Sequence, residues 1–264
     1  MERRDYEVGG DLPWNEVVYS LAKDIEGLVK PLFGTPEGGR NIGTNVSGDV
    51  TKYVDKVAEE TAIERLKPLG INIVSEEVGL IDQGSEYTAV IDPIDGSYNF
   101  AVGIPIFAFS FALFRTEKPV YSALYEFTTG RYYEAIPGEG AYLNGSPIHV
   151  SPSEPKRAAV SFYTRGAGTG LIGRVKRVRV LGAIAVELAY LARGAIQAVV
   201  DARNYVRPTD IAAGVLLVRE AGGIVTDERG KELRVHLSAE ENMNVVAAAD
   251  EALLKIILEE LGGR

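Results

Sequence analysis

The residues best suited to chemistry are two carboxylates three positions apart, Asp92 and Asp95, with Gly96 and Ser97 directly after them. They follow a buried apolar run, and Pro93 makes the chain turn because its ring fixes φ and removes a backbone donor. Gly96 lets the backbone approach a ligand, and the N–H groups that follow are open if a helix begins there. Carboxylates beside open amides fit a cation on the acids and an anion on the amides. A metal-bound phosphate meets both conditions.

The composition restricts the metal to an oxygen-bound cation. The 264 residues include no cysteine and only two histidines, His149 and His236, which excludes disulfides, thiolate zinc and multi-histidine sites. Mg²⁺, Mn²⁺ or Ca²⁺ remain. The net charge of −9 argues against general binding to nucleic acid or acidic membranes. Because no apolar run reaches the roughly 20 residues of a membrane span and residues 1–5 lack a secretion-signal core, we expect a soluble cytoplasmic protein.

Two more acidic positions are candidates for the same site. A strand expected over 71–75 ends at Glu76, and the next expected strand ends at Asp92. If these strands are neighbours, the two carboxylates meet at one sheet edge; otherwise Glu76 belongs to an ordinary solvated turn. Asp210 begins a helix expected over 210–220, where an Asp is also a common N-cap.

The two halves of the chain follow different patterns. Short turns separate the strand-like runs after the central stretch, which favours an antiparallel sheet. Beyond a linker at 151–155, strands and helices alternate, which favours an α/β arrangement. We therefore expect an N-terminal α+β domain, 1–152, with most of the acids, and a C-terminal α/β domain, 153–264, that supplies Asp210 and substrate contacts.

The other elements expected in the N-terminal half are a helix over 13–33 capped by Asp11, a loop over 34–43, a helix ending near 66 that Thr51 caps, and strands over 107–115, 120–126, 131–135 and 148–150. In the C-terminal half we expect a strand over 158–162, a helix over 169–175, a strand over 179–181, a helix over 183–192, a strand over 195–200 and a polar crossing over 201–210. Strands over 224–226 and 244–248 and a helix over 251–261 complete this half.

Four motifs follow one another in order along nearly the whole chain: Gly48-Asp-Val-Thr with Asp55, Ser75-Glu-Glu, Ile91-Asp-Pro-Ile-Asp-Gly-Ser-Tyr-Asn-Phe100, and Thr209-Asp-Ile-Ala-Ala-Gly214 with Glu220-Ala-Gly-Gly223. Together they resemble the inositol monophosphatase family. The most similar group looks like the archaeal-type enzymes that act on both inositol phosphates and fructose 1,6-bisphosphate. The resemblance implies a layered α-β-α-β-α sandwich of the sugar-phosphatase type (mixed α+β and α/β), and a homodimer. Ile91 and Thr209 stand where many members have Trp, and Ser97 replaces a common Thr but keeps the hydroxyl.

The resemblance also implies ligands for two Mg²⁺ ions, for which Mn²⁺ can substitute. Glu76, Asp92 and the carbonyl of Ile94 would hold the first ion. Asp92, Asp95 and Asp210 would hold the second. Glu76 and Ser97 would orient the attacking water. Positions matching those that orient water or a third, weaker metal are Thr51 and Asp55, with Asp49 on the loop nearby.

Gly182, Ala183, Glu187 and Asp201 match positions that face the polyol in relatives, where Asp201 would accept hydrogen bonds from substrate hydroxyls. Tyr163 and Arg165 follow a strand end near the proposed pocket, and Arg165 is expected to clamp a distal phosphate, with Arg203 and the run Arg174–Arg179 as rivals. The full set expected to contact substrate is Asp95, Gly96, Ser97, Tyr163, Arg165, Gly182, Ala183, Glu187, Asp201 and Arg203.

The function that these features imply is Mg²⁺-dependent hydrolysis of fructose 1,6-bisphosphate, inositol 1-phosphate or both, by in-line attack of a metal-activated water. Such an enzyme would serve gluconeogenesis and carbohydrate metabolism and would be sensitive to Li⁺. One alternative is a nucleotide 3′-phosphatase, which needs an adenine slot for which the sequence offers no clear aromatic pair. Another is a non-catalytic regulatory or scaffold member that binds protein or RNA.

Overall fold

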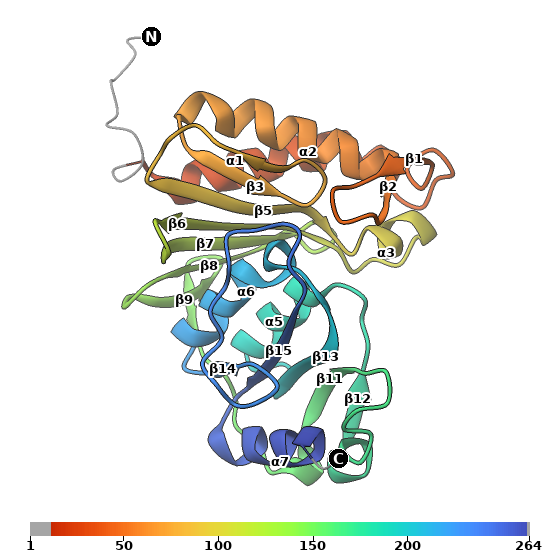
Figure 1. Ribbon diagram of the computed structural model, residues 1–264, viewed down its shortest axis with the longest axis vertical. Coiled ribbons are helices and arrows are strands. Elements are labelled where there is room, and N and C mark those ends of the chain that lie inside the picture. The colour runs from red at the N-terminus through yellow and green to blue at the C-terminus, as the bar shows by residue number, and fades with distance from the viewer. Residues whose placement is uncertain (1–11, 263–264) are drawn as a thin grey trace.

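The computed structural model describes residues 12–262, which form five stacked layers (Figure 1). The expected α-β-α-β-α sandwich is confirmed. Two helices cover one face of the larger sheet, two more lie between the sheets, and the last helix covers the outer face of the smaller sheet. In sequence the layers are α1 (Trp14–Val29) with α2 (Tyr53–Leu66), an eight-stranded sheet, α5 (Ile184–Ala192) with α6 (Pro208–Glu220), a five-stranded sheet, and α7 (Glu251–Gly262).

The eight-stranded sheet is antiparallel except at one pair. Its order is β10-β9-β8-β7-β6-β5-β3-β4, and only β3 and β5 run parallel. Asn144 and Gly145, both with positive φ, form the turn that joins β9 to β10. Strands β4 and β9 were not expected, because each begins with a glycine, a residue that sequence patterns assign to turns. The strands are β3 (Asn72–Ser75), β4 (Gly79–Ile81), β5 (Tyr87–Asp95), β6 (Ala108–Arg115), β7 (Lys118–Glu126), β8 (Arg131–Ile136), β9 (Gly140–Leu143) and β10 (Ser146–Ile148).

The five-stranded sheet has the order β12-β11-β13-β15-β14. The expected polar crossing over 201–210 is wrong, because β13 continues to Val206 and α6 begins at Pro208. The polar composition hid this strand: Asp201 is neutralised by an ion pair with Arg203, so the polar run can stay extended. The strands are β11 (Ala159–Tyr163), β12 (Arg177–Arg179), β13 (Ala198–Val206), β14 (Ile224–Thr226) and β15 (Met243–Ala248).

The segment before α2 is more regular than expected. Part of the expected loop over 34–43 pairs with the residues before α2 in a two-stranded hairpin. Lys52, not Thr51, is the N-cap of α2, so the capping role expected for Thr51 is wrong. Asp11 lies outside the described residues. The remaining elements are β1 (Asn41–Thr44), β2 (Val50–Lys52), α3 (Ser97–Val102), α4 (Leu171–Arg174) and 3₁₀ turns at Lys30–Leu32, Lys67–Leu69 and Pro155–Arg157.

Apolar packing fixes the layers in place. One cluster joins α1 and α2 to the larger sheet, including Leu21 and Phe111, and another packs Leu188 and Leu217 of the central helices against both sheets. Each fully buried side chain of this size contributes about 1.5–3 kcal/mol. A further cluster packs the start of α6 against β3, β5 and β6 on the face of the larger sheet. The division into domains at residue 152 stays a prediction. Within residues 12–262, no helix has the length and apolar character needed to cross a bilayer.

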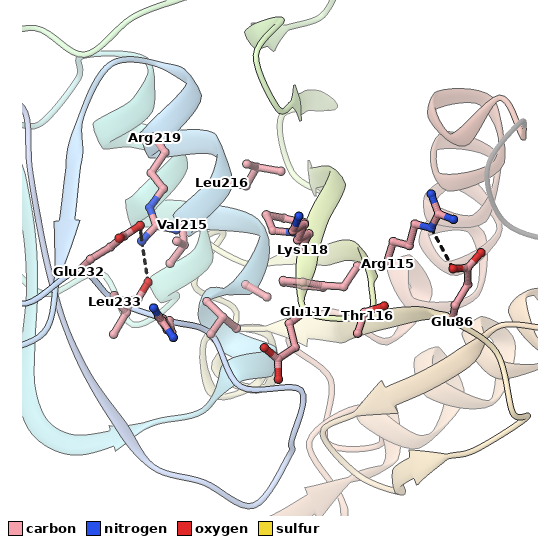
Figure 2. Close-up of a pocket in the computed structure, with 15 residues that line it drawn as sticks. Glu86, Arg115, Thr116, Glu117, Lys118, Val215, Leu216, Arg219, Glu232 and Leu233 are labelled. Carbon is pink, nitrogen blue, oxygen red and sulfur yellow. Dashed lines mark hydrogen bonds and ion pairs between the residues drawn. The ribbon is translucent and has the colours of Figure 1, made fainter.

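A cavity of about 980 Å³ lies between the β6–β7 turn, α6 and residues 232–235 (Figure 2). Its floor is apolar and includes Val215 and Leu216, and charges of both signs stand around it. Arg115 pairs with Glu86 at 2.9 Å, which places opposite charges together at one side of the rim. The candidate site described next lies in a smaller cavity.

Candidate active site

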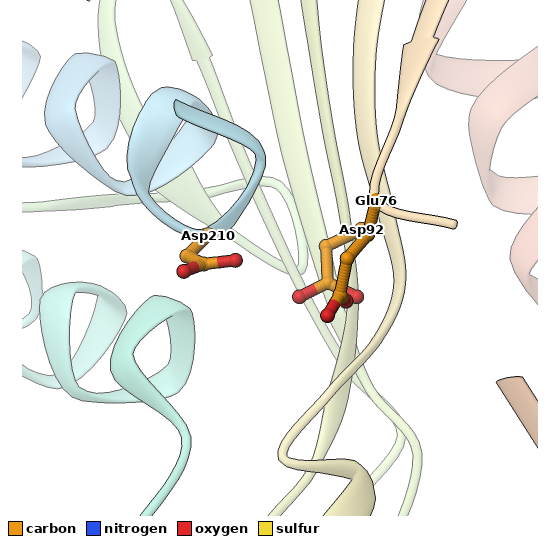
Figure 3. A group of neighbouring side chains, drawn as sticks. All are labelled: Glu76, Asp92 and Asp210. Atoms are coloured by element: carbon orange, nitrogen blue, oxygen red, sulfur yellow. The ribbon is translucent and has the colours of Figure 1, made fainter. Parts of the chain in front are cut away.

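The strand register brings two carboxylates together. Ser75 of β3 pairs with Ile91 of β5 in the parallel ladder, so Glu76 and Asp92 follow at the same sheet edge. Asp210 approaches from the start of α6, as Figure 3 shows. One carboxylate oxygen from each of these three residues lies within 4.8 Å of the other two. The meeting of Glu76 and Asp92 expected from the sequence is therefore confirmed, and Asp210 joins them.

A break in the sheet register shapes the stretch between Asp92 and Asp95. The β5–β6 ladder shifts between these residues, and the N–H of Ile94 donates to Asp92 Oδ1 at 3.0 Å. Asp95 then turns toward α5, where its Oδ2 accepts the N–H of Val186 at 3.3 Å. Both carboxylates are almost fully buried, Asp92 being 4% and Asp95 5% exposed. The bulge thus directs the two acids to different neighbours.

Asp210 occupies the third position of α6, not its N-cap. Its Oδ2 accepts the backbone N–H of Arg207, the N-cap, at 2.8 Å. Asp55 is placed in the same way in α2, accepting the N–H of Lys52 at 2.8 Å. A carboxylate in the first turn is favoured by the positive end of the helix dipole. Both helices therefore direct an acid and a basic N-cap residue toward the same region.

The acids are short of compensating charge. Burial, with Glu76 and Asp95 close by, raises the pKa of Asp92 well above its usual range. Burial raises the pKa of Glu76 to about 8, although the positive charge of Arg207 opposes the rise. Burial also raises the pKa of Asp210, again against Arg207. Like charges that cannot all ionise together are stabilised by a cation.

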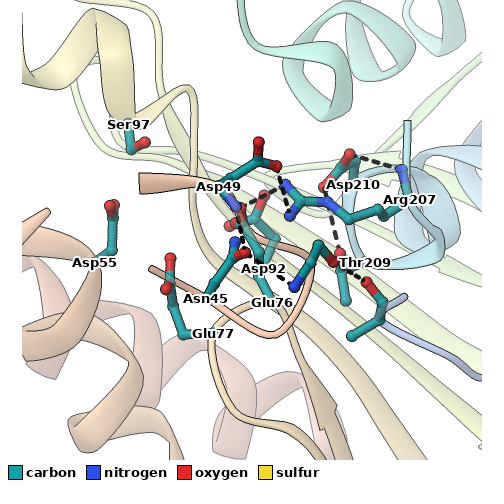
Figure 4. A network of polar contacts seen from close by, with 12 residues as sticks. Asn45, Asp49, Asp55, Glu76, Glu77, Asp92, Ser97, Arg207, Thr209 and Asp210 are labelled. Atoms are coloured by element: carbon teal, nitrogen blue, oxygen red, sulfur yellow. Dashed lines mark hydrogen bonds and ion pairs between the residues drawn. The ribbon is translucent and has the colours of Figure 1, made fainter. Parts of the chain in front are cut away.

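Two basic side chains at this site, Arg207 and Lys52, were not predicted from the sequence. Figure 4 shows the Arg207 guanidinium among the acids: it donates to Glu76, and its Nη1 lies 3.3 Å from Asp49 Oδ2. Lys52 Nζ donates to Ser97 Oγ at 3.0 Å. A signal existed in both cases, since a basic residue three positions before a helical Asp is an unusual N-cap.

The Ser97 hydroxyl lies against the Asp55 carboxylate. Burial raises the pKa of Asp55 to about 6, and the N–H and charge of Lys52 and, more weakly, the Ser97 hydroxyl oppose the rise. That Glu76 and Ser97 together orient the attacking water stays a prediction. Thr51 lies in β2 and donates to Glu77.

Gly96 has φ +87, and a Cβ there would lie 2.9 Å from both the Ala183 Cβ and the Ile106 carbonyl. The backbone of the central stretch can therefore follow this path only with glycine. Ala183 itself is buried beneath Gly96 and does not line the site cavity.

A cavity of about 280 Å³ opens over the acids. Of the predicted site residues, those that do not line it are Asp49, Thr51, Asp55, Arg165, Ala183, Glu187 and Asp201. Its lining residues are Glu76, Asp92, Ile94, Asp95, Gly96, Ser97, Tyr98, Tyr163, Gly182, Ile184, Arg203, Tyr205, Val206, Arg207 and Asp210.

Comparison with known proteins agrees with this geometry. A sequence model of the inositol monophosphatase family matches residues 12–262. A fructose-1,6-bisphosphatase/inositol-1-monophosphatase of Thermococcus kodakarensis is 64% identical over 94% of this chain and 97% of its own. The chain belongs to the inositol monophosphatase family. The resemblance noted in the sequence is thereby confirmed, and this member of the family is a phosphatase.

Solved structures support the same assignment. An inositol monophosphatase–fructose 1,6-bisphosphatase is 44% identical to this phosphatase with a TM-score of 0.92, covering 95% of this chain and 100% of its own. A hypothetical protein from Pyrococcus horikoshii, described as similar to inositol-1 monophosphatase, is 53% identical with a TM-score of 0.88, covering 94% and 97%.

One wall of the phosphatase cavity is built around Arg203. Asp201 is fully buried and binds the Arg203 guanidinium through both oxygens, with Nη2 to Oδ2 at 2.6 Å. The guanidinium lies over Tyr163 at 4.6 Å and over Tyr205 at 5.1 Å from the ring centres. The expected contact between Asp201 and a substrate hydroxyl does not fit this position, because Arg203 occupies the carboxylate.

Glu187 lies beneath the cavity. It is fully buried and accepts the Ser161 hydroxyl and the Leu181 N–H, each at 2.7 Å. The next N–H, of Gly182, donates to Tyr163 Oη at 2.8 Å. Direct substrate contact, which was expected of Glu187, does not fit its burial. In this phosphatase it supports the loop that carries Gly182.

Proposed function

We propose that this phosphatase hydrolyses the phosphomonoesters of fructose 1,6-bisphosphate and inositol 1-phosphate with Mg²⁺ as cofactor. The observation that carries the proposal is the trio Glu76, Asp92 and Asp210, whose oxygens converge within 4.8 Å beside Ser97 at the floor of the cavity. Carboxylates that converge from two strand ends and a helix start, next to a hydroxyl and open amides, suit a metal-bound phosphate.

The donor set fits the proposed cofactor. All the convergent groups are oxygens, and hard divalent cations such as Mg²⁺ prefer oxygen ligands. Glu76, Asp92 and Asp210 would hold one ion, while Asp95 and the Ile94 carbonyl lie along the same wall for a further one. When bound, Mg²⁺ would offset charge on the phosphate oxygens and lower the pKa of a water ligand.

The chain itself would orient the attacking water through Ser97 and Asp55. The Ser97 hydroxyl contacts Asp55, and burial raises the pKa of this carboxyl to about 6, so it can accept a proton near neutral pH. Lys52 Nζ, donating to Ser97 Oγ, fixes the hydroxyl so that its proton is directed toward the acid. This contact favours Asp55 over Glu76 as the acceptor.

The phosphate and the leaving group would occupy opposite ends of the cavity. The amides that follow Gly96 and the Lys52 ammonium offer donors to phosphate oxygens. Tyr163 and Gly182 line the end toward the smaller sheet, where a sugar or inositol ring would lie. There Arg203 and Tyr205 line the cavity, and Arg165 lies over the Tyr205 ring at 5.7 Å, from where it would bind a distal phosphate.

A nucleotide 3′-phosphatase is the second candidate, because Tyr98 and Tyr205 line the cavity and are 69% and 44% exposed. Exposed rings are platforms on which a base can stack. The space between Tyr163 and Tyr205 is already occupied by the Arg203 guanidinium, which favours the sugar and inositol phosphates.

The test is a phosphate-release panel over fructose 1,6-bisphosphate, inositol 1-phosphate and a nucleoside 3′-phosphate, with Mg²⁺ or EDTA and with added Li⁺. We expect release from the first two only with Mg²⁺, and inhibition by Li⁺. Release confined to the nucleotide would favour the second candidate, and release in EDTA would exclude the metal mechanism. A homodimer and a cytoplasmic location remain predictions that light scattering and cell fractionation can check.

A further inference from the structure

Arg207 makes contacts that its position in the helix does not explain. It is the N-cap of α6, where the partial positive charge of the helix end repels a cation and where Ser, Thr, Asp or Asn are the usual residues. The backbone N–H of Arg207 already meets the needs of the cap by donating to Asp210. Its guanidinium is free to point elsewhere, and it points into the acids.

The guanidinium joins three separate segments. Nη2 donates to Glu76 at the end of β3, Nη1 lies 3.3 Å from Asp49 in the β1–β2 loop, and Nε lies 3.7 Å from Asp210 (Figure 4). The side chain is only 10% exposed. A guanidinium is costly to bury unless carboxylates surround it. Although burial lowers the pKa of Arg207, the charges of Asp210, Glu76 and Asp92 outweigh it, so the net effect is a raised pKa.

Glu76 and Asp210 are therefore shared between the proposed metal site and Arg207. They are two of the three acids whose oxygens converge for the proposed cation, and both are also partners of Arg207. A divalent cation on these carboxylates would have the guanidinium as its neighbour, and two cations at such range repel each other. If the Arg207 guanidinium moves away from Glu76, its contact with Asp49 is lost as well, because the same side chain makes both contacts.

We propose that Arg207 is a built-in competitor for the divalent cation: its guanidinium and the metal exchange on Glu76 and Asp210, and metal binding releases the Asp49 loop. The inference rests on the proposed function. Under this proposal Arg207, which is not itself a metal ligand, sets the metal concentration at which the site is filled. It also couples metal binding to the β1–β2 loop, which is attached to the other half through Ser47 Oγ and the Ala239 carbonyl at 2.9 Å.

The test compares Arg207→Gln with wild type by calorimetric titration with MgCl₂ and no substrate. Lys118→Gln is the matched control, because it removes the same charge from an exposed position in β7. Losing the competitor should tighten Mg²⁺ binding at least about tenfold, given the size of charge interactions near a protein surface. Lys118→Gln should leave the dissociation constant within about twofold of wild type, since Lys118 is exposed and solvent and salt screen its charge.

Melting curves supply a second readout. In EDTA, Arg207→Gln should melt below wild type because the acids lose their counter-charge, and saturating Mg²⁺ should restore most of the difference. Arg207→Lys keeps the charge but cannot hold Asp49 and Glu76 together, so its Mg²⁺ affinity should lie between the other two.

Unchanged or weaker Mg²⁺ binding by Arg207→Gln would overturn the competitor role even if wild type binds Mg²⁺ and releases phosphate. If wild type binds no Mg²⁺ at all, the proposed function fails together with this inference. If Arg207→Gln does not fold, the titration of Arg207→Lys decides, and affinity equal to that of wild type counts against exchange.

Discussion

Ser75 and Ile91 are register partners in the one parallel strand pair of the larger sheet. This pairing sets the position of the site, because the residue after each partner is an acid and the parallel direction brings both acids to the same end of the strand pair. An antiparallel pair would have sent Glu76 and Asp92 to opposite ends of the sheet. The third acid, Asp210, reaches the same point because α6 packs against the face of that sheet.

The first prediction concerns the acids themselves. Asp92→Asn and Asp210→Asn should each lower turnover by more than the roughly 10–100-fold that loss of a supporting residue costs at metal sites. Both variants should stay folded, since each removes one of several repelling charges. Phosphate release with saturating Mg²⁺ measures the effect, and circular dichroism checks the fold. Asp24→Asn, on the outer helix α1, is the control. Mg²⁺-dependent release at the wild-type rate from either site variant would refute the ligand assignment.

The second prediction concerns Gly96. In Gly96→Ala the new methyl group would meet Ala183 and a carbonyl at 2.9 Å in a backbone conformation that costs an L residue roughly 1–2 kcal/mol. We expect a lower melting temperature and loss of activity. Gly222→Ala is a matched control, because Gly222 has φ +86 but no atom within 4 Å of its added Cβ. Equal destabilisation of the two variants would mean that the contact with Ala183 does not contribute to the loss of stability in Gly96→Ala.

The third prediction follows from the raised pKa of Glu76. The ordinary pKa of this carboxyl is 4.5, and burial raises it to about 8 in the folded protein. Between these values the folded state keeps a proton that the unfolded state has lost, so stability falls as pH rises. In EDTA the melting temperature should therefore decrease from about pH 5 to about pH 8.

Saturating Mg²⁺ should flatten that pH dependence, because a bound cation stabilises the ionised carboxylate. Glu76→Gln should also flatten it in EDTA, since the amide does not titrate. The measurement is a series of thermal melts in buffers of matched ionic strength. A slope in Glu76→Gln as steep as in wild type would assign the effect to other groups.

The sequence predicts the site acids better than their partners. Asp92, Glu76 and Asp210 stand where expected because strand ends and helix starts are local features that hydrophobic patterns reveal. The ion pair of Asp201 with Arg203 could not be foreseen in that way, because a charged pair within an extended run looks like a loop.

The same limit applies to Arg207 and Lys52. Whether a long basic side chain extends into solvent or folds back onto an acid depends on which segments the tertiary fold places around it. Asp49 and Glu76, the partners of Arg207, lie in other elements, and the sequence does not show that they are near. The burial of Glu187 also depends on the tertiary fold, because a helix that packs between two sheets exposes neither face.

The last prediction separates the two substrates. Arg165 lies over Tyr205 at the rim of the cavity, with no carboxylate partner among residues 12–262, so it is available to a distal phosphate. Arg165→Ala should lower kcat/KM for fructose 1,6-bisphosphate by about 10–100-fold, the worth of a charge-assisted hydrogen bond, and spare inositol 1-phosphate, which has no second phosphate. Arg174→Ala serves as control, because Arg174 is paired with Glu260 at 2.9 Å. Equal losses on both substrates would reject the distal role, and a selective loss in Arg174→Ala would move it to the Arg174–Arg179 run.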